Sequence, residues 1–286
     1  MTILVVSKKS VYELYKHSPD DIAARQYVQK HEADMKASHE RQQRTLETVL
    51  DELQKLGLPA KEVYRAHLPE EDLSTYELVI PVGGDGTLLE VSHYVQDTPL
   101  LGVNSDPLKS VGFFCAATQK TIGDLLRHLD QTPSTKLHRL QLVRDGTALP
   151  EPVLNDVLFA HTNPGANTRF TLDVGGKQQT YRGSNGLLAC TAAGSTAWMW
   201  QLGGKIMPLH SQQLQYKVRD ARGEEPHFAN ELKIISQCRE GRLYIDGEHL
   251  QYDLGLDQTL EIRAGIPLTV MGDIETKRNE LFPGGV

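Results

Sequence analysis

Residues 79–90 read Val79-Ile80-Pro81-Val82-Gly83-Gly84-Asp85-Gly86-Thr87-Leu88-Leu89-Glu90, and the rest of the chain can be interpreted around them. The apolar run from Leu78 to Val82 predicts a buried strand, because β-branched residues favour a pleated surface that is covered on both faces. From Thr87 onward, apolar residues recur near helical spacing and predict a helix. Asp85 is therefore expected in a strand-to-helix turn, with a glycine on each side.

The turn at residues 83–86 combines a backbone suited to phosphate with one acidic side chain. Glycine can adopt positive φ and lets the backbone come close to a ligand. The unpaired N–H groups at the start of the next helix also favour an anion. Asp85 would repel phosphate unless a cation or a proton intervened. The turn therefore indicates a phosphoryl-transfer site with a metal or a base rather than a plain tight turn.

The composition is that of a globular protein with room for one large or two ordinary domains, since 39% of its 286 residues are hydrophobic and 23% are charged. No apolar run could span a membrane and residues 3–6 already predict a strand, so neither a membrane anchor nor a signal peptide is expected. The formal charge of −7 argues against nucleic acid as a partner. Cys115, Cys190 and Cys238 are far apart, which fits reduced thiols and a cytoplasmic location.

The first half of the chain alternates predicted strands and helices. Strands are expected at residues 2–7, 63–66, 78–82 and 99–104, and helices from Ser18 to Gly57, after residue 87 and at 121–129. This order predicts a parallel, doubly wound α/β sheet with ligands at the carboxyl ends of its strands, where Asp85 and Asn104 are expected. The middle of the long helix, residues 29–44, is almost wholly polar. It could be a solvated helix, a mobile loop or an arm that contacts a second subunit.

After Pro133 the pattern changes to short strands separated by glycine and proline turns, which predicts a β-sandwich. The strands are expected at residues 136–144, 153–161, 168–174, 186–191, 214–218, 231–236, 242–245, 259–263 and 268–271. We therefore predict an α/β domain at residues 1–133 and a β-sandwich domain at residues 134–270.

Two groups of polar residues interrupt the predicted strands of the second domain. Asn155 and Asp156 stand in an apolar strand, where an unpaired polar group would cost about 1–3 kcal/mol, so they either satisfy local backbone groups or face a ligand. Ser195 and Thr196 stand among small residues at a predicted helix start, followed by Trp198. That segment suits a nucleoside, because small residues admit the base and an aromatic ring stacks on it. A close helix–strand crossing would also explain the small residues.

Three segments, in this order, resemble the NAD kinases: Gly83-Gly84-Asp85-Gly86-Thr87, Asn155-Asp156 and Gly194-Ser195-Thr196-Ala197. The resemblance extends from Leu78 to about Gly247, and Ser184-Asn185-Gly186-Leu187 is similar to the branch of plant NADH kinases and animal mitochondrial NAD kinases. It implies an α/β domain followed by a β-sandwich, with residues 271–286 packed back on the first domain.

The resemblance also implies an activity. Members of this family transfer the γ-phosphoryl group of ATP to the 2′-hydroxyl of the adenosine ribose of NAD or NADH, giving NADP(H), and they assemble as homodimers or homotetramers. Mg²⁺ would be bound mainly through phosphate oxygens and needs few protein ligands, so no metal-ligating residue is assigned.

Roles for individual residues follow from the same resemblance. Asp85 matches the proposed catalytic acid. The residues implied in binding are Gly83, Gly84, Gly86 and Thr87 at the phosphates, Phe113, Phe114, Thr196 and Ala197 around the adenine, and Asn155 and Asp156 at the adenosine and its ribose. Asp156 stands where many members have glutamate, and Asp246-Gly247 resembles a turn of the second domain. Lys109, Arg182, Lys205 or Arg219 could neutralise the phosphates, but their spacing selects none of them.

Two positions depart from the family pattern. Asn185 replaces an aspartate that lies near the nicotinamide end in the family. The attraction for the positively charged oxidised ring is then lost, whereas the neutral reduced ring loses little. We therefore expect NADH to be accepted at least as well as NAD. Trp198 replaces a tyrosine, which keeps a stacking surface but not the hydroxyl.

Other functions would share part of this pattern. Diacylglycerol- or sphingosine-type lipid kinases contain Gly-Gly-Asp-Gly-Thr, but they would be expected to show a Gly-Thr-x-Asn-Asp-like segment where this chain reads Val111-Gly112-Phe113-Phe114-Cys115. Phosphofructokinases run as a longer double α/β chain, and a Rossmann dehydrogenase needs G-x-G-x-x-G after its first strand. A non-enzymatic dinucleotide-binding sensor is a further alternative, against which the presence of Asp85 argues.

Overall fold

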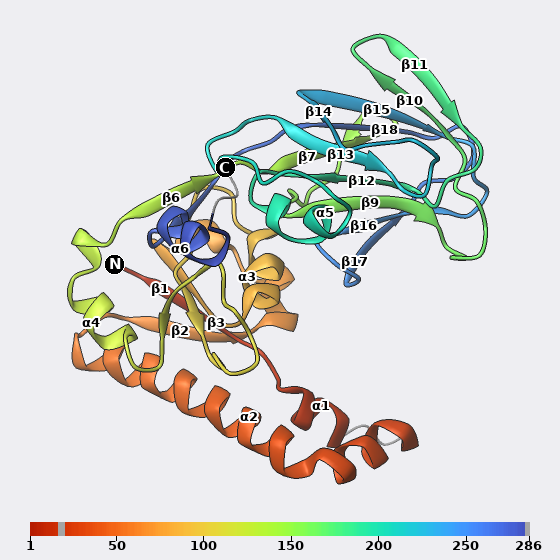
Figure 1. The fold of residues 1–286 in the computed structure, drawn as a ribbon. Helices are drawn as coiled ribbons and strands as arrows, with labels where there is room; N and C mark the ends of the chain where they lie inside the picture. The colour runs from red at the N-terminus through yellow and green to blue at the C-terminus, as the bar shows by residue number, and fades with distance from the viewer. Residues whose placement is uncertain (17–20, 284–286) are drawn as a thin grey trace. The chain divides into compact units, whose positions relative to one another are not determined.

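The computed structural model describes residues 1–16 and 21–283 and shows two compact units (Figure 1). Unit 1 comprises Met1–Thr135 and Thr269–Leu281, and unit 2 comprises Lys136–Leu268 together with the described residues 282–283. Residues 284–286 of the predicted C-terminal segment lie outside the described part of the chain.

Unit 1 is built on a parallel sheet. In spatial order its five strands are β2 (Ala60–Tyr64), β1 (Ile3–Ser7), β3 (Leu78–Gly83), β4 (Gly102–Asn104) and β5 (Cys115–Thr118). On one face, Ile80 and Val82 share a core with Leu53 of α2 (Ile22–Lys55). Side chains of a strand alternate between the two faces of the sheet. On the other face Leu88 of α3 (Asp85–Ser92) lies over Gly102, since a Cβ added to Gly102 would be 2.9 Å from Leu88 Cδ1. Helices on both faces confirm the predicted doubly wound α/β fold.

The remaining helices of unit 1 are short. They are α1 (Val11–Lys16), α4 (Ile122–Arg127) and α6 (Ile274–Leu281), with 3₁₀ helices at Arg65–Glu70, Leu73–Thr75 and Leu129–Gln131. Helix α4 joins α2 on the same face of the sheet, because Ile122 and Leu126 belong to the core that contains Leu53.

The predicted long helix forms, as α2, with Asp21 capping its first turn. The predicted start at Ser18 lies outside the described residues. Its polar middle is helical, and side chains there bond within unit 1, since Ser38 and Arg41 donate to Asp106 at 2.5 and 2.7 Å. Those polar positions therefore serve the packing of unit 1; a contact with a second subunit stays a prediction.

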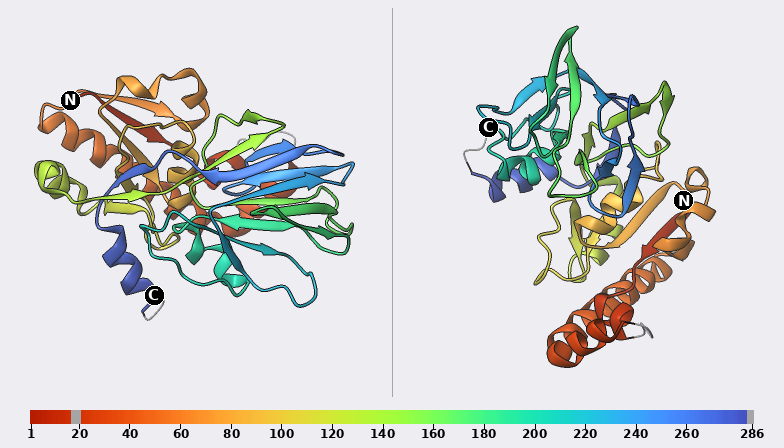
Figure 2. Two further views of the ribbon diagram at one scale, coloured as in Figure 1. Left: turned by 90° about the horizontal axis from the view of Figure 1, so that it is seen from above. Right: turned by 90° about the vertical axis from the view of Figure 1, so that its right-hand side faces the viewer.

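Unit 2 contains two six-stranded antiparallel sheets (Figure 2). One has the order β11 (Lys177–Tyr181), β10 (Phe170–Val174), β15 (Glu231–Ser236), β18 (Thr259–Ala264), β7 (Leu140–Arg144) and β8 (Thr147–Ala148). The other has the order β14 (His227–Ala229), β13 (Leu214–Val218), β12 (Leu187–Cys190), β9 (Asp156–His161), β16 (Gly241–Ile245) and β17 (Leu250–Asp253). Phe170 and Ile234 of the first sheet share a core with Phe159 and Leu187 of the second, which confirms the predicted β-sandwich.

Two predicted strands need correction. The strand predicted at residues 63–66 forms at Ala60–Tyr64, because a 3₁₀ helix begins at Arg65. The strand predicted at residues 136–144 is divided into β6 (Ser134–Leu137), which pairs with β19 (Leu268–Met271), and β7. The break falls at the fully buried Arg139, whose Nε donates to the carbonyl of Ile266 at 2.8 Å.

Candidate functional site

The glycine turn joins β3 directly to α3, which begins at Asp85, two residues earlier than predicted. Among the described residues no side chain caps this helix, so the backbone N–H groups of its first turn remain open to a ligand. A Cβ at Gly83 would lie 2.1 Å from Thr87 Oγ1, and one at Gly84 would lie 2.4 Å from Ser110 Oγ. The two glycines are therefore required by the close packing of this turn.

The Asp85 carboxylate is held by the loop that precedes β5. Its Oδ1 accepts the N–H of Phe114 at 2.9 Å. The loop is fixed from α6, because Lys277 Nζ donates to the carbonyl of Cys115 at 2.9 Å and also to that of Gly112. Phe113 and Phe114 are largely buried and pack edge to face, with ring centroids 4.8 Å apart. The aromatic pair thus belongs to the packing of unit 1 beside Asp85.

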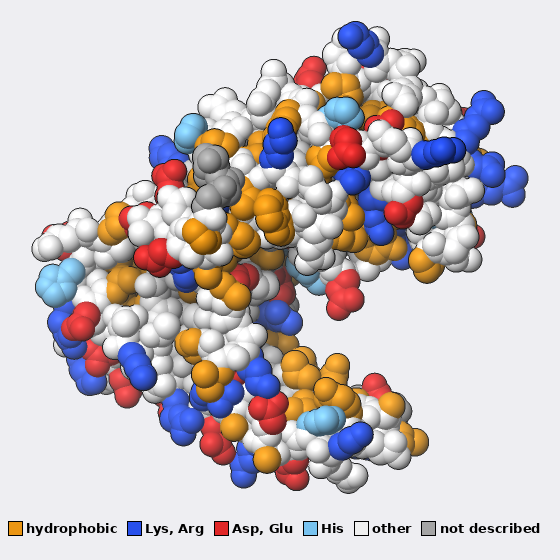
Figure 3. Space-filling model, in the orientation of Figure 1, with side chains coloured by type: hydrophobic (Ala, Val, Ile, Leu, Met, Phe, Trp, Pro, Cys, Tyr) orange, Lys and Arg blue, Asp and Glu red, His pale blue; other side chains and the backbone are white. Residues whose placement is uncertain are grey.

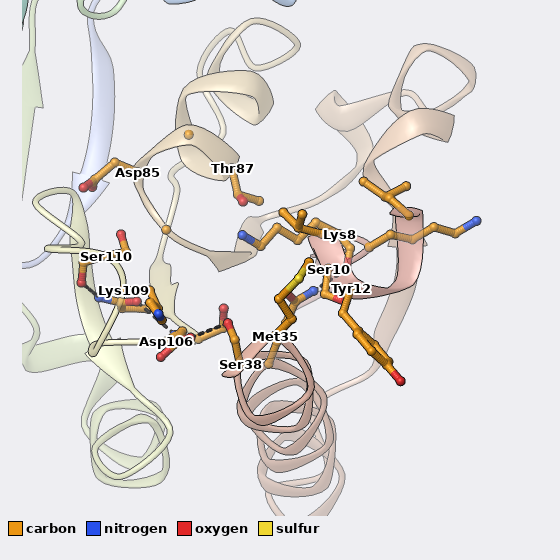
Figure 4. A pocket seen from close by; sticks show the side chains of 18 of the residues that line it. Lys8, Ser10, Tyr12, Met35, Ser38, Asp85, Thr87, Asp106, Lys109 and Ser110 are labelled. Carbon is orange, nitrogen blue, oxygen red and sulfur yellow. Dashed lines mark hydrogen bonds between the residues drawn. The ribbon is translucent and has the colours of Figure 1, made fainter. Parts of the chain in front are cut away.

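A cavity of about 550 Å³ opens beside the glycine turn (Figure 4). It is lined by Gly84, Asp85, Gly86 and Thr87 of the turn, by residues 8–12 after β1, by residues of α2, and by Asn104, Ser105, Asp106, Lys109 and Ser110 after β4. The carboxyl ends of adjacent parallel strands thus contribute to one cavity, as expected for a doubly wound sheet.

Three carboxylates of the described chain line this cavity, and two of them are paired with cations. Asp34 bonds Lys109 at 2.7 Å. Burial alone would raise the pKa of Asp106, but hydrogen bonds from Arg41 and Ser38 hold it below its usual value. Asp85 accepts only the Phe114 N–H within the described residues, so its second oxygen is available for chemistry.

The cations of the cavity differ from those proposed from the sequence. Of the four candidates only Lys109 lines it; Arg182 and Lys205 are exposed elsewhere in unit 2. Lys8, Lys9 and Arg65 also line the cavity and were missed. The sequence feature that indicates Lys8 is its position directly after the first predicted strand, because ligands bind at the carboxyl ends of the strands of such a sheet.

In unit 2, Asn155 and Asp156 lie on a backbone segment that Asp246 holds. The Asp246 carboxylate accepts the N–H groups of Leu154, Asn155 and Asp156 at 2.8, 2.7 and 2.9 Å. Thr191 N–H donates to the carbonyl of Asn155 at 2.9 Å from the other side. Within the described residues, the buried Asn155 Oδ1 has no hydrogen-bond partner, so this oxygen is an acceptor that a ligand could use.

Burial and the neighbouring Asp246 raise the pKa of Asp156 from 3.8 to about 7. The unfolded chain then loses the proton at lower pH than the folded one, so stability falls as the pH rises from about 4 to about 7. We expect Asp156→Asn to become more stable than the wild type across this window, by at most about 4 kcal/mol. Urea unfolding at pH 4 to 8 would measure it, with the exposed Asp124→Asn as control. A difference between variant and wild type that does not change with pH would contradict the prediction.

The predicted nucleoside segment forms a 3₁₀ turn at Gly194–Thr196 followed by α5 (Trp198–Gln201). Ser195 is fully buried and bonded, since its Oγ donates to Ala192 O and accepts Met207 N–H. Thr196, Ala197 and Trp198 are partly exposed. Of the two hydroxyls, only that of Thr196 can therefore reach a ligand.

Asn185 lies apart from that turn in sequence but near a charged group. Its Nδ2 donates to Asp220 Oδ2 at 2.7 Å. Arg219, the residue before Asp220, lies over the ring of Trp198, with its Cζ 4.9 Å from the ring centroid. Asn185 and Arg219 line a second cavity of about 320 Å³. The Asp220 carboxylate thus lies in hydrogen-bond contact with the neutral amide of Asn185.

The described residues show neither a cluster of metal-ligating side chains nor a membrane-spanning helix. Within residues 1–16 and 21–283, no three His, Cys, Asp or Glu side chains gather as a metal site would require. No helix in the same residues is both long and apolar enough to span a membrane.

Comparison with known proteins gives consistent matches. A family model described as the ATP-NAD kinase N-terminal domain matches residues 4–132. A probable NADH kinase of Oryza sativa subsp. japonica is 34% identical over 230 residues, 67% of this chain and 69% of that protein. The NADH kinase of Arabidopsis thaliana is 34% identical over 233 residues, 67% of this chain and 71% of that protein.

Two solved structures share the fold. An NAD kinase from Archaeoglobus fulgidus in complex with ATP has a TM-score of 0.71 at 17% identity, covering 99% of this chain and 97% of its own. A yeast NADH kinase complexed with NADH has a TM-score of 0.68 at 16% identity, covering 100% of this chain and 89% of its own.

Proposed function

The chain belongs to the NAD kinase family, and from this premise we propose that it transfers the γ-phosphoryl group of ATP to the 2′-hydroxyl of the adenosine ribose of NAD and NADH. The observation that supports this best is Asp85, a carboxylate in the glycine turn at the start of α3 that has no cationic partner among the described residues. Asp85 would take the proton of the 2′-hydroxyl or orient that group for attack. Phosphoryl transfer otherwise needs positioning and charge neutralisation more than covalent chemistry.

The donor would lie in the cavity beside the turn. Gly83, Gly84, Gly86 and Thr87 would hold its phosphates through backbone donors at the start of α3. The cavity extends to Val11, Leu14 and Tyr27 of α1 and α2, which are exposed and contribute to an apolar surface there (Figure 3). Such a wall suits the base of a nucleotide and offers nothing to inorganic polyphosphate.

Mg²⁺ fits this cavity, because it needs one or two carboxylates besides phosphate oxygens and Asp85 has a free oxygen. When bound, the ion neutralises charge on the phosphate oxygens. Asp34 and Asp106 are already paired with cations, so Asp85 is the carboxylate that would hold it.

The adenosine of the acceptor would bind to unit 2. Asn155 Oδ1 would accept a hydrogen bond, and Asp156 would contact the ribose. Thr196 and Ala197 would line the adenine pocket and Trp198 would stack, while Asn185 would lie toward the nicotinamide. Phe113 and Phe114 are assigned to the adenine pocket by the resemblance to the family. Both rings are largely buried in the free protein, so their exposure adds no support.

An assay that crosses NAD and NADH with ATP and polyphosphate tests this function. NADP or NADPH formation from ATP is the expected result. The lipid-kinase alternative gains no support from the relatives described above, and phosphorylation of diacylglycerol or sphingosine with no product from NAD(H) would revive it. Dinucleotide binding without turnover would favour the sensor. We also propose a cytoplasmic homodimer or homotetramer, which size-exclusion chromatography with light scattering and cell fractionation would test.

NADH is expected to be used at least as well as NAD. Asn185→Asp should shift the ratio of kcat/KM values several-fold toward NAD, because an added carboxylate near the cationic ring contributes up to about 1 kcal/mol. Asp220→Asn should shift it toward NADH, because it removes the carboxylate that contacts Asn185. Steady-state kinetics on both acceptors measure the ratio. A strong preference of the wild type for NAD would overturn the expectation.

A further inference from the structure

We propose that Lys8 binds the phosphoryl group that this enzyme transfers, as the cation that neutralises its charge. The inference rests on the proposed function and names the basic residue that the sequence could not select. Lys8 directly follows β1, which lies beside β3 in the parallel sheet. Its side chain lines the same cavity as Asp85 and Thr87 (Figure 4).

The other cations of this cavity already have partners. Arg65 Nη1 bonds Glu90 at 2.7 Å, and Lys109 bonds Asp34 at 2.7 Å. The Lys9 ammonium lies over the ring of Tyr64, 5.1 Å from its centroid. Within the described residues, the Lys8 ammonium makes no hydrogen bond or ion pair. Lys8 is thus the cation of this cavity whose charge remains available to a ligand.

The backbone of Lys8 is fixed although its ammonium group is not engaged. Gln42 of α2 donates from Nε2 to the Lys8 carbonyl. The side chain therefore starts from a defined position and has its head group free, which is the arrangement expected of a ligand-binding lysine. A flexible surface lysine would instead extend into solvent.

The surroundings of Lys8 favour an anion. Burial lowers the pKa of Lys8, and the charge of Arg65 lowers it further; Asp106 acts in the opposite direction without cancelling these effects. A half-buried ammonium without a counter-ion is unfavourable, and phosphate oxygens would supply that counter-ion. Together with the N–H groups at the start of α3, the site provides a positive charge on one side and backbone donors on the other.

Kinetics of Lys8→Met, which keeps the length of the side chain but removes its charge, test the proposal. We expect kcat to fall about 10²-fold or more, as when one donor to transition-state charge is removed. The KM for ATP should rise, whereas the KM for NAD or NADH should stay within about threefold, because a general loss of structure would affect both substrates. Lys8→Arg should restore part of kcat. Lys120→Met, an exposed lysine outside the cavity, is the matched control.

A kcat for Lys8→Met within about threefold of the wild type would overturn the proposal. If the wild type itself forms no NADP(H), the proposed function fails instead, so the two failures are distinguishable.

A second measurement uses the unaltered protein, so it tests the proposal even if Lys8→Met does not fold. An amine-acylating reagent is applied with and without ATP, ADP or NAD, and the modified lysines are identified by peptide mass spectrometry. We expect saturating ATP to protect Lys8 more than ADP does, and NAD to leave it reactive. Equal labelling of Lys8 with and without ATP would overturn the assignment.

Discussion

Asp85→Asn is expected to fold normally and to lose about 10²–10⁴-fold in kcat. Asparagine has nearly the shape of aspartate, and its Oδ1 can still accept the Phe114 N–H that Asp85 accepts at 2.9 Å. The substitution therefore preserves the packing of the turn against the loop before β5. What it removes is the negative charge and the ability to take a proton from the 2′-hydroxyl. The KM for NAD should change little, because Asn155, Asp156 and Thr196, which we propose bind the adenosine, belong to unit 2.

Steady-state kinetics with ATP and NAD measure this loss, and thermal unfolding confirms that the variant is folded. Asp124→Asn is a suitable control, because Asp124 is exposed and its carboxylate pairs with Arg127 on the same helix. Asp106→Asn provides a contrast, since it should lower stability through the loss of the Arg41 ion pair. Full activity of Asp85→Asn would refute its assignment as the catalytic residue.

The prediction of the fold from sequence succeeded for strands with a buried face and failed at the sheet edges. Strands β13, β15 and β19 form at the residues predicted. The missed strands β5, β8, β11, β14 and β17 each stand at the end of a sheet's spatial order. β11 is the clearest case, because four of its five residues are exposed and polar, so no apolar alternation marks it. Edge strands are defined by their partner, which a single sequence does not reveal.

The prediction of the site has a corresponding limit. Asp85 could be proposed because it is the one carboxylate in a glycine turn suited to phosphate, and Asn155 because it is a polar residue in a predicted apolar strand. Lys8 could not be chosen among the basic residues, since the choice depends on which of them already have partners. Lys277 bonds the carbonyl of Cys115 from 162 residues away. Such a contact has no signal in the local sequence.

Gly194→Ala is expected to destabilise unit 2 by about 1–3 kcal/mol or more, the usual cost of inserting a methyl group into close packing. The added Cβ would lie 2.1 Å from the carbonyl oxygen of Asn155, 2.6 Å from its carbonyl carbon and 2.8 Å from its Cα. These are backbone atoms, so a rotamer change cannot relieve the contact. The backbone at Asn155 is also held by Asp246 and Thr191. Moving it would break those hydrogen bonds and displace the buried acceptor Asn155 Oδ1.

The same displacement should raise the KM for NAD and NADH, whereas kcat with saturating substrates should fall less, because Asp85 is untouched. Gly183→Ala is the matched control, since a Cβ there would meet nothing within 4 Å. Urea unfolding and steady-state kinetics of both variants separate the effect of the contact from that of an added methyl group. A stability within about 0.5 kcal/mol of the wild type, together with an unchanged KM, would show that residues 191–194 can move away from Asn155 at little cost. The close approach of these two segments would then have no part in holding Asn155 for the adenosine.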